Sequence, residues 1–289
     1  MSVPAARWQA LWHRVRTRTG EWRPRRGSGD GICLSRRHEL LANVQSIEPL
    51  RVDRIDLLGS EEPLWIRHTA NFERLLDNAV YDPDQEFMPY WAEIWPSGVV
   101  LAAVIARDPG ALAGKHVLEL GPGVGVTAAA ALKAGADLVV ADFAPKALAL
   151  CALNTLDQTG KEPRTLRVNW RRSQRELLAA AGEGFSIVLG ADVLYDMEDV
   201  PVLIGLVDRI VAPGGELWIA EPGRDPAKRF VKLLRGQKWR VVSEEFASPL
   251  PDPNYQTMDT ITVHRLRRPG QATVRRRRAE SQRGSPSSP

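Results

Sequence analysis

The stretch that decides the fold is "LELGPGVGV", residues 118–126. An apolar run over 116–120 leads into a turn with three glycines, and the alanine-rich run "VTAAAALKAG" (126–135) follows. Glycine lacks a Cβ, so the backbone at this turn can adopt positive φ and approach a ligand closely. The pattern predicts a buried strand, a glycine-rich turn and then a helix that ends at Gly135.

Downstream of this turn, apolar runs alternate with helical patterns. We expect strands at 138–142, 165–170, 185–193 and 216–221, with helices between them that include one opened by Pro145 and one over 199–215 stopped by Pro213. Two further strands, 239–246 and 259–266, most simply form an antiparallel pair at the sheet edge. Repeated βα units imply a mainly parallel sheet covered on both faces. The prediction is an α/β, doubly wound (Rossmann-like) fold with a mostly parallel seven-stranded sheet, whose ligand lies beyond the carboxyl ends of the strands.

The residues ahead of this region are less regular. "RVDRIDLL" (51–58) alternates apolar and charged residues, as a half-buried strand does, and "PLWIRHT" (63–69) can pair with it. We interpret residues 31–88 as a small N-terminal β extension and residues 89–268 as the main domain.

Positive charge gathers at the two ends of the chain. Residues 1–30 hold seven arginines against two acidic residues, and residues 265–289 hold eight arginines against one, although the whole chain carries only +4. The body between them is therefore net acidic. Residues 269–289 are polar and rich in Pro and Ser, which predicts a disordered basic tail.

The N-terminal segment, residues 1–30, has a different pattern. Its apolar residues fall at helical spacing on a basic background: Trp8, Leu11, Trp12 and Val15. Such a helix can dock on the protein's own body, touch a membrane surface or an acidic partner, or serve as an organellar presequence.

Two features of the composition indicate the compartment in which the protein works. No apolar run approaches the roughly 18 residues that span a bilayer, so we expect a soluble protein. Cys33 and Cys151 lack CxxC spacing and a nearby histidine pair, so neither a disulfide framework nor a metal site is expected. We expect a cytoplasmic protein, or one of an organellar matrix if residues 1–30 are a presequence.

The glycine turn differs from the common phosphate-binding loops. A dinucleotide-binding G-x-G-x-x-G would place glycine where this chain has Val126, and no Walker lysine follows. Instead Glu119 precedes the first of Gly121, Gly123 and Gly125, which gives E-x-G-x-G-x-G. This form resembles motif I of the seven-strand methyltransferases that use S-adenosyl-L-methionine. The cationic sulfonium and ammonium groups of that cofactor make a carboxylate at the strand end chemically sensible.

Other cofactor-binding candidates follow the next strands. Asp142 ends the second strand, beside Phe143, and can accept hydrogen bonds from both ribose hydroxyls, or it can cap the helix at Pro145. The resemblance places the adenine pocket at Asn169 and Trp170, where the indole offers a flat face to a purine. A tryptophan buried in the core is the alternative for Trp170.

Two more motifs resemble the lysine methyltransferase branch, the methyltransferase-16 group. These are "PYWAEIWPSG" (89–98) and "ADVLYD" (191–196), and the whole likeness covers roughly residues 85–225. It is strongest to the lysine methyltransferases of the electron transfer flavoprotein β-subunit and their bacterial relatives. The resemblance implies that Trp95 contacts the cofactor and that Ala191 lies beside the adenosine. It also implies that Asp192 and Tyr195 handle the acceptor.

In the same segment, Trp91 is expected to pack or to form the rim of the acceptor channel, and Glu93 is a candidate to line it. The implied acceptor is a protein that presents a lysine, and the basic ends of the chain can contact an acidic partner.

Two other enzyme classes stay open. A small-molecule amine N-methyltransferase would share the same body. A nucleic-acid methyltransferase would suit the basic ends, although that class usually carries N/D-P-P-Y/F where this chain has "ADVLYD". The oligomeric state is left open.

Overall fold

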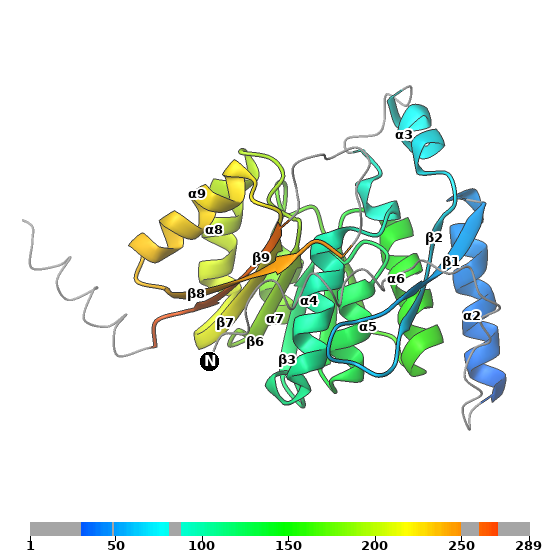
Figure 1. Ribbon diagram of the computed structural model, residues 1–289, viewed down its shortest axis with the longest axis horizontal. Helices are drawn as coiled ribbons and strands as arrows, with labels where there is room; N and C mark the ends of the chain where they lie inside the picture. Colours follow the sequence, from blue (N-terminus) through cyan, green and yellow to red (C-terminus); the bar gives the residue numbers. More distant parts are fainter. Residues whose placement is uncertain (1–29, 48, 81–87, 250–259, 271–289) are drawn as a thin grey trace, which may run out of the picture.

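The computed structural model describes residues 30–47, 49–80, 88–249 and 260–270. Among them, seven strands form one sheet in the order β5-β4-β3-β6-β7-β9-β8 (Figure 1). The strands are β3 (His116–Leu120), β4 (Asp137–Asp142), β5 (Arg164–Arg167), β6 (Phe185–Ala191), β7 (Val211–Glu221), β8 (Arg240–Ala247) and β9 (Thr260–Arg267). The strands β3 to β7 pair in parallel, whereas β9 pairs antiparallel with both β7 and β8. The predicted fold class and the antiparallel edge pair are confirmed.

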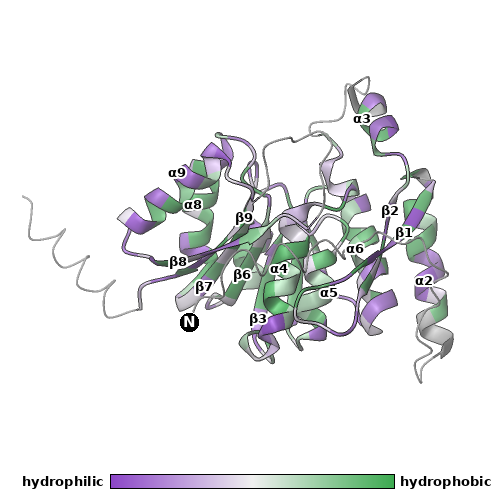
Figure 2. Ribbon diagram, viewed as in Figure 1, coloured by the Kyte–Doolittle hydropathy of each residue, from purple (hydrophilic) through white to green (hydrophobic). Residues whose placement is uncertain are grey.

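Helices cover both faces of this sheet, and each face has its own apolar core. One core packs against α4 (Pro96–Arg107), α5 (Val126–Lys133) and α6 (Pro145–Thr159). The other packs against α7 (Arg175–Ala181), α8 (Asp199–Ile210) and α9 (Asp225–Gly236). Figure 2 shows the hydrophobic residues concentrated in α4, α5 and the central strands. Burial on both faces explains why the central parallel strands β3, β4 and β6 are mostly apolar, whereas β5 at the sheet edge has the sequence RTLR and is mostly exposed.

The N-terminal extension contains the predicted strand pair. β1 (Leu50–Ile55) and β2 (Leu64–Thr69) form a separate antiparallel sheet, followed by α3 (Phe72–Val80). An isolated hairpin is marginally stable in water. Here two side chains of α6 hydrogen-bond to the backbone of β2. Asn154 Oδ1 accepts from the Arg67 N–H at 2.8 Å, and Gln158 Oε1 accepts from the Trp65 N–H at 3.0 Å. Both amide side chains are buried, so the extension is joined to the main body through α6.

A helix that the sequence analysis did not predict precedes this hairpin. The helix α2 (Asp30–Val44) packs against α6 at the side of the molecule (Figure 1). Its sequence mixes polar and apolar residues without a clear stripe. Leu40 and Val44 are buried, and Arg37 pairs with Asp157 of α6 at 2.7 Å. These partners lie more than a hundred residues away, so no local pattern could reveal them.

Several predicted boundaries differ from the structure by three residues or more. β5 ends at Arg167, so Asn169 and Trp170 follow the strand and are not part of it. The helix predicted over 199–215 ends at Ile210, because Val211 already pairs with Phe185 of β6 and begins β7. The register then shifts, and the residues around Pro213 are accommodated as an irregularity within the strand.

Within the described ranges, three short 3₁₀ turns lie at Gln45–Ile47, Tyr90–Ala92 and Pro109–Ala111. None of the helices in the described ranges is long and apolar enough to cross a membrane. The amphipathic pattern of the N-terminal segment and nearly all of the basic tail lie outside the described residues. The predicted domain boundaries stay predictions.

Candidate functional site

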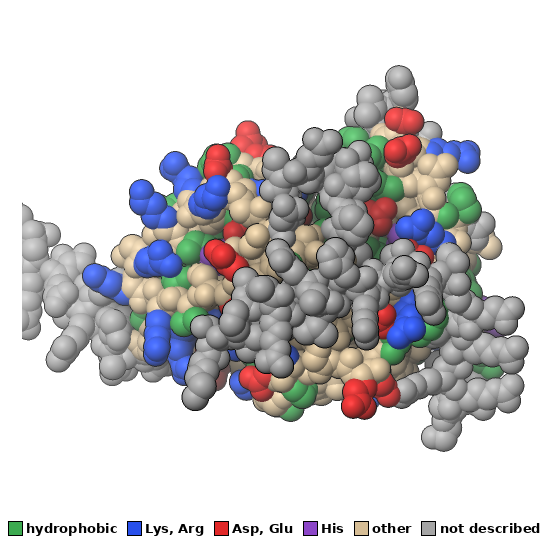
Figure 3. Space-filling view, viewed as in Figure 1, with side chains coloured by type: hydrophobic (Ala, Val, Ile, Leu, Met, Phe, Trp, Pro, Cys, Tyr) green, Lys and Arg blue, Asp and Glu red, His purple; other side chains and the backbone are tan. Residues whose placement is uncertain are grey.

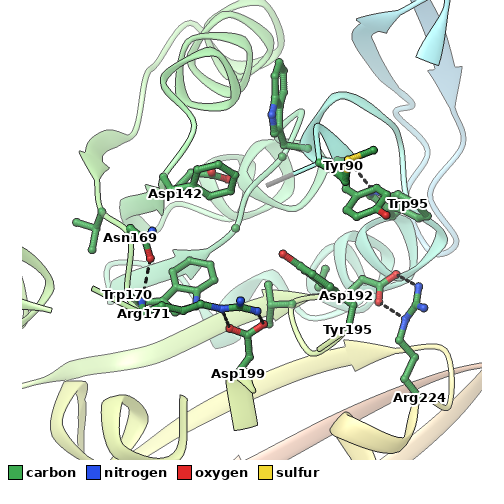
Figure 4. Close-up of a pocket in the computed structure, with 18 residues that line it drawn as sticks. Tyr90, Trp95, Asp142, Asn169, Trp170, Arg171, Asp192, Tyr195, Asp199 and Arg224 are labelled. Atoms are coloured by element: carbon green, nitrogen blue, oxygen red, sulfur yellow. Dashed lines mark hydrogen bonds and ion pairs between the residues drawn. The ribbon is translucent and has the colours of Figure 1, made fainter. Parts of the chain in front are cut away.

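A pocket opens at the carboxyl ends of the central strands (Figure 4). The site residues expected from the sequence line it, except Glu119, Gly125 and the channel candidate Glu93. Its walls come from the turn after β3, the end of β4, the stretch after β5, the end of β6 with the stretch after it, and the residues just before α4. These segments contribute Gly121, Gly123, Asp142, Phe143, Asn169, Trp170, Ala191, Asp192, Tyr195 and Trp95. The expected position of the ligand, beyond the carboxyl ends of the strands, therefore coincides with a pocket.

The glycine turn divides into a part that faces the pocket and a part that packs. Gly123 has φ 52°, and a Cβ there would lie 3.3 Å from the Trp91 carbonyl oxygen. Gly125 has φ 87°, and a Cβ there would lie 2.9 Å from Cys151 Sγ and 3.0 Å from its Cα. Gly125 thus lets the start of α5 approach α6 and does not face the pocket.

Glu119 lies on β3 below the glycine turn. Its side chain is buried, and Oε2 has no hydrogen-bond partner among the described residues. Burial raises the pKa of this carboxyl to about 8. A buried acceptor without a partner needs an explanation, and a ligand donor is one of the few available.

Asp142 both hydrogen-bonds to the backbone at the start of α6 and lines the pocket. Oδ1 accepts a hydrogen bond from the Ala144 N–H at 2.9 Å, directly before α6 begins at Pro145. The carboxyl also lines the pocket although it is nearly buried. Burial raises its pKa to about 7, an effect that backbone N–H donors partly offset. The helix-start and ligand-binding interpretations of Asp142 are therefore geometrically compatible.

The stretch after β5 forms the opposite wall. The Trp170 ring is partly buried against the second core and also lines the pocket. Arg171, which the sequence analysis missed, holds this wall in place with a bidentate contact to Asp199 at 2.6 and 2.7 Å. It also contacts Asp196 at 2.9 Å, so it ties the wall to the start of α8.

The stretch after β6 carries the D-x-x-Y residues. Asp192 has φ 54°, in the left-handed region that aspartate tolerates better than most residues, and its N–H donates to the Ala220 carbonyl. The Asp192 carboxylate accepts from Arg224 Nε at 2.9 Å and from Nη2 at 3.3 Å. Burial raises the pKa of Asp192, and Arg224 opposes that change.

Tyr195 completes this end of the pocket. Its side chain is 42% exposed, and Figure 4 shows its hydroxyl pointing into the cavity. The ring meets that of Tyr90 edge-on, with centroids 6.0 Å apart. Partial burial raises the pKa of Tyr195 to about 12, so the hydroxyl stays protonated at neutral pH.

The segment before α4 is an aromatic wall. Trp95 Nε1 donates to the Tyr90 carbonyl at 2.7 Å, and Trp91 also lines the pocket. Glu93 does not, which contradicts the expectation that it lines the channel: its Oε1 accepts from the Ile94 N–H and lies 3.2 Å from His68 Nδ1 of β2. A buried histidine in another part of the fold thus determines where Glu93 points.

Arg224 is another pocket residue that the sequence analysis missed. It follows the carboxyl end of β7 by three residues, the same kind of position as Asp142 and Asp192. The strand-end rule was the available signal, but nothing in the local sequence marks this arginine as a pocket residue.

Comparison with known proteins adds a family and several relatives. The family model described as lysine methyltransferase matches residues 89–237. The ubiquinone biosynthesis O-methyltransferase of Cereibacter sphaeroides (strain ATCC 17025 / ATH 2.4.3) is 31% identical over 142 residues, which cover 48% of this chain and 55% of that protein. The electron transfer flavoprotein beta subunit lysine methyltransferase of Mus musculus is 31% identical over 181 residues, or 61% of this chain and 64% of that protein. The same-named protein of Rattus norvegicus is 34% identical over 142 residues, or 47% and 51%. The chain therefore spans between about half and two thirds of the length of these relatives.

Proposed function

Because the chain belongs to the lysine methyltransferase family, we propose that it transfers methyl groups from S-adenosyl-L-methionine to the ε-amine of a lysine in a protein substrate. One observation carries the proposal: a single pocket joins the glycine turn and Asp142 to Asp192 and Tyr195. A donor site and an acceptor site for group transfer must meet in this way, because positioning supplies most of the catalysis in such a displacement.

The residues present fit this cofactor. The buried Oε2 atom of Glu119, which has no hydrogen-bond partner among the described residues, the glycine turn without side chains and the carboxyl of Asp142 suit the cationic amino-acid part and the ribose. The adenine would be held by Phe143, Asn169, Trp170 and Ala191, and Trp95 would close the aromatic side. Bound S-adenosylmethionine supplies an activated methyl group on a sulfonium.

The acceptor end must take an amine as a free nucleophile. A lysine has a pKa near 10.4 in water, so only about one in a thousand or fewer is neutral at pH 7. Asp192 accepts a hydrogen bond from the amine and orients its lone pair, while the Tyr195 and Tyr90 rings shape the opening and offer faces to a methylated ammonium. Tyr195 keeps its proton at neutral pH and therefore acts as a donor or a ring face, not as a base.

We further propose that basic surface recruits the substrate protein. In the described part of the chain, α9 has an exposed basic face formed by Lys228, Arg229, Lys232 and Arg235. Figure 3 shows Lys and Arg side chains over the region of α9. An acidic partner that docks there or on the basic ends of the chain would give a KM that rises with salt. A reducing compartment, the cytoplasm or an organellar matrix, suits the unpaired Cys151 thiol.

The test is methyl transfer from labelled S-adenosylmethionine to proteins in a lysate of the source cells, with the modified residue identified by mass spectrometry. Asp192→Asn and Tyr195→Phe should keep S-adenosylhomocysteine affinity within a few fold and cut transfer by about 10²-fold, the loss expected from a misaligned acceptor. Asp208→Asn, an exposed change on α8, serves as the matched control. Label on a small amine, a hydroxyl or a nucleic acid in place of lysine would overturn the proposal.

A further inference from the structure

The acceptor end of the pocket contains an ion pair that a lysine-binding site does not obviously need. We propose that Arg224 neutralises the Asp192 carboxylate, so that the site receives the acceptor amine in its neutral, nucleophilic form. This inference rests on the proposed function, because it assigns a role in lysine methylation to a residue of the same pocket.

The contact is side-on and shielded from water. Arg224 Nε and Nη2 donate to the two different oxygens of Asp192, and the two side chains are only 22% and 10% exposed. Figure 4 shows the guanidinium meeting the carboxylate at the end of the pocket where Tyr195 lies. Such two-point contacts are among the strongest and most directional in proteins.

A buried carboxylate fixes the backbone that carries Arg224. Glu221 Oε2, at the end of β7, accepts hydrogen bonds from the N–H groups of Gly223 and Arg224. The other oxygen of Glu221 lies 3.2 Å from His264 Nε2 of β9, and Ser243 Oγ of β8 lies 2.8 Å from His264 Nδ1. The sheet edge thus anchors the loop, and the guanidinium that it presents cannot deprotonate.

The chemical problem at this site is one of charge. A lone carboxylate within about 4–6 Å of an amine favours the ammonium form, which has no lone pair to attack a methyl group. Arg224 removes that preference because the pair with Asp192 has no net charge. A carboxylate offers about four lone-pair sites, so two remain for an amine N–H after Arg224 has taken one on each oxygen. Orientation by Asp192 is therefore kept while its pull toward the protonated amine is cancelled.

The other charged groups around the acceptor end are already engaged. Across the pocket, Arg171 is paired with Asp196 and Asp199, and Asp142 lies at the cofactor end. Glu221 is occupied by backbone N–H groups and His264. Among the described residues that line the pocket, Arg224 is therefore the cation placed to balance Asp192.

The decisive experiment is the pH dependence of kcat and KM for Arg224→Gln and Arg224→Lys, from pH 6 to pH 10, with saturating S-adenosylmethionine and the lysine substrate. In Arg224→Gln, the acidic limb of kcat should move up by about one to two pH units, as expected for loss of a cation about 6 Å from the amine. KM at pH 7 should fall or hold, because the ammonium now binds Asp192 well, and kcat should recover at high pH. Arg224→Lys should keep the limb near the wild-type position.

Controls separate this role from a structural one. Arg240→Gln, an exposed change at the start of β8 and outside the pocket, should leave the profile unchanged, and calorimetry with S-adenosylhomocysteine should show that each variant is folded. A loss in Arg224→Gln that is equal at every pH would overturn the inference, as would a fall in KM with kcat unchanged throughout. The proposed function fails separately, if the wild-type enzyme labels no lysine. If it labels lysine and the limb does not move, only the role of Arg224 is wrong.

Discussion

The buried carboxyl of Glu119 is expected to respond to one substitution in two opposite ways. Glu119→Gln should stabilise the ligand-free protein at alkaline pH and should weaken its binding of the cofactor. Both effects follow from an Oε2 atom that is buried and has no hydrogen-bond partner in the described part of the chain.

The sign and size of the stability effect follow from the pKa. Burial raises the pKa of Glu119 from 4.5 to about 8, so the folded protein holds this proton over a range in which the unfolded chain has released it. Stability of the free protein therefore falls as pH rises through that window, by about 1.4 kcal/mol per pH unit. Between pH 6 and pH 8, Glu119 alone should lower the free energy of unfolding by about 2 kcal/mol.

Urea unfolding at pH 6 and at pH 8 measures how much Glu119 changes the free energy of unfolding. Glu119→Gln removes the titrating group, so the fall in stability between pH 6 and pH 8 should be about 2 kcal/mol smaller than in the wild type. Glu183→Gln, the same change at an exposed position, should leave the fall unchanged. An equal pH dependence in wild type and Glu119→Gln would refute the reasoning.

Calorimetry tests the other half of the prediction. A cationic ligand group favours the ionised carboxylate, so wild-type affinity for S-adenosylmethionine should rise between pH 6 and pH 8. Glu119→Gln should bind about ten- to a hundredfold more weakly at pH 8, the usual worth of a hydrogen bond to a charged group. Unchanged affinity at pH 8 would remove Glu119 from the cofactor site.

Two further predictions concern the glycine turn and the ribose contact. Gly125→Ala should lower the free energy of unfolding by about 3 kcal/mol or more in urea titrations, because positive φ and overlap with Cys151 add together. Gly160→Ala, also at positive φ but with no atom within 4 Å of the new Cβ, should cost only about 1 kcal/mol, and equal costs would rule out the packing role. Asp142→Asn should weaken S-adenosylhomocysteine binding by at least about tenfold in calorimetry, since an acceptor for both ribose hydroxyls loses its charge. Unaltered binding would contradict the proposed ribose contact.

The local patterns of the sequence were sufficient for the main sheet and for most of the pocket wall. The strand, glycine turn and helix over 116–135 are contiguous, so their signals of burial, positive φ and helical propensity are all local. Asp142 and Asp192 directly end or follow strands, and parallel strands bring their carboxyl ends to one edge of the sheet. That rule is enough to bring residues 50 positions apart into one pocket.

The direction in which particular side chains point was decided by tertiary structure. Glu93 lies between two pocket tryptophans in sequence but turns toward His68, which comes from a different sheet. Arg224 meets Asp192 because β6 and β7 are neighbours, a pairing that neither local sequence encodes. Gly125 faces Cys151 because α5 packs on α6. A backbone conformation depends largely on nearby residues, whereas a buried polar or charged side chain adopts the position where a distant partner compensates for its lost hydration.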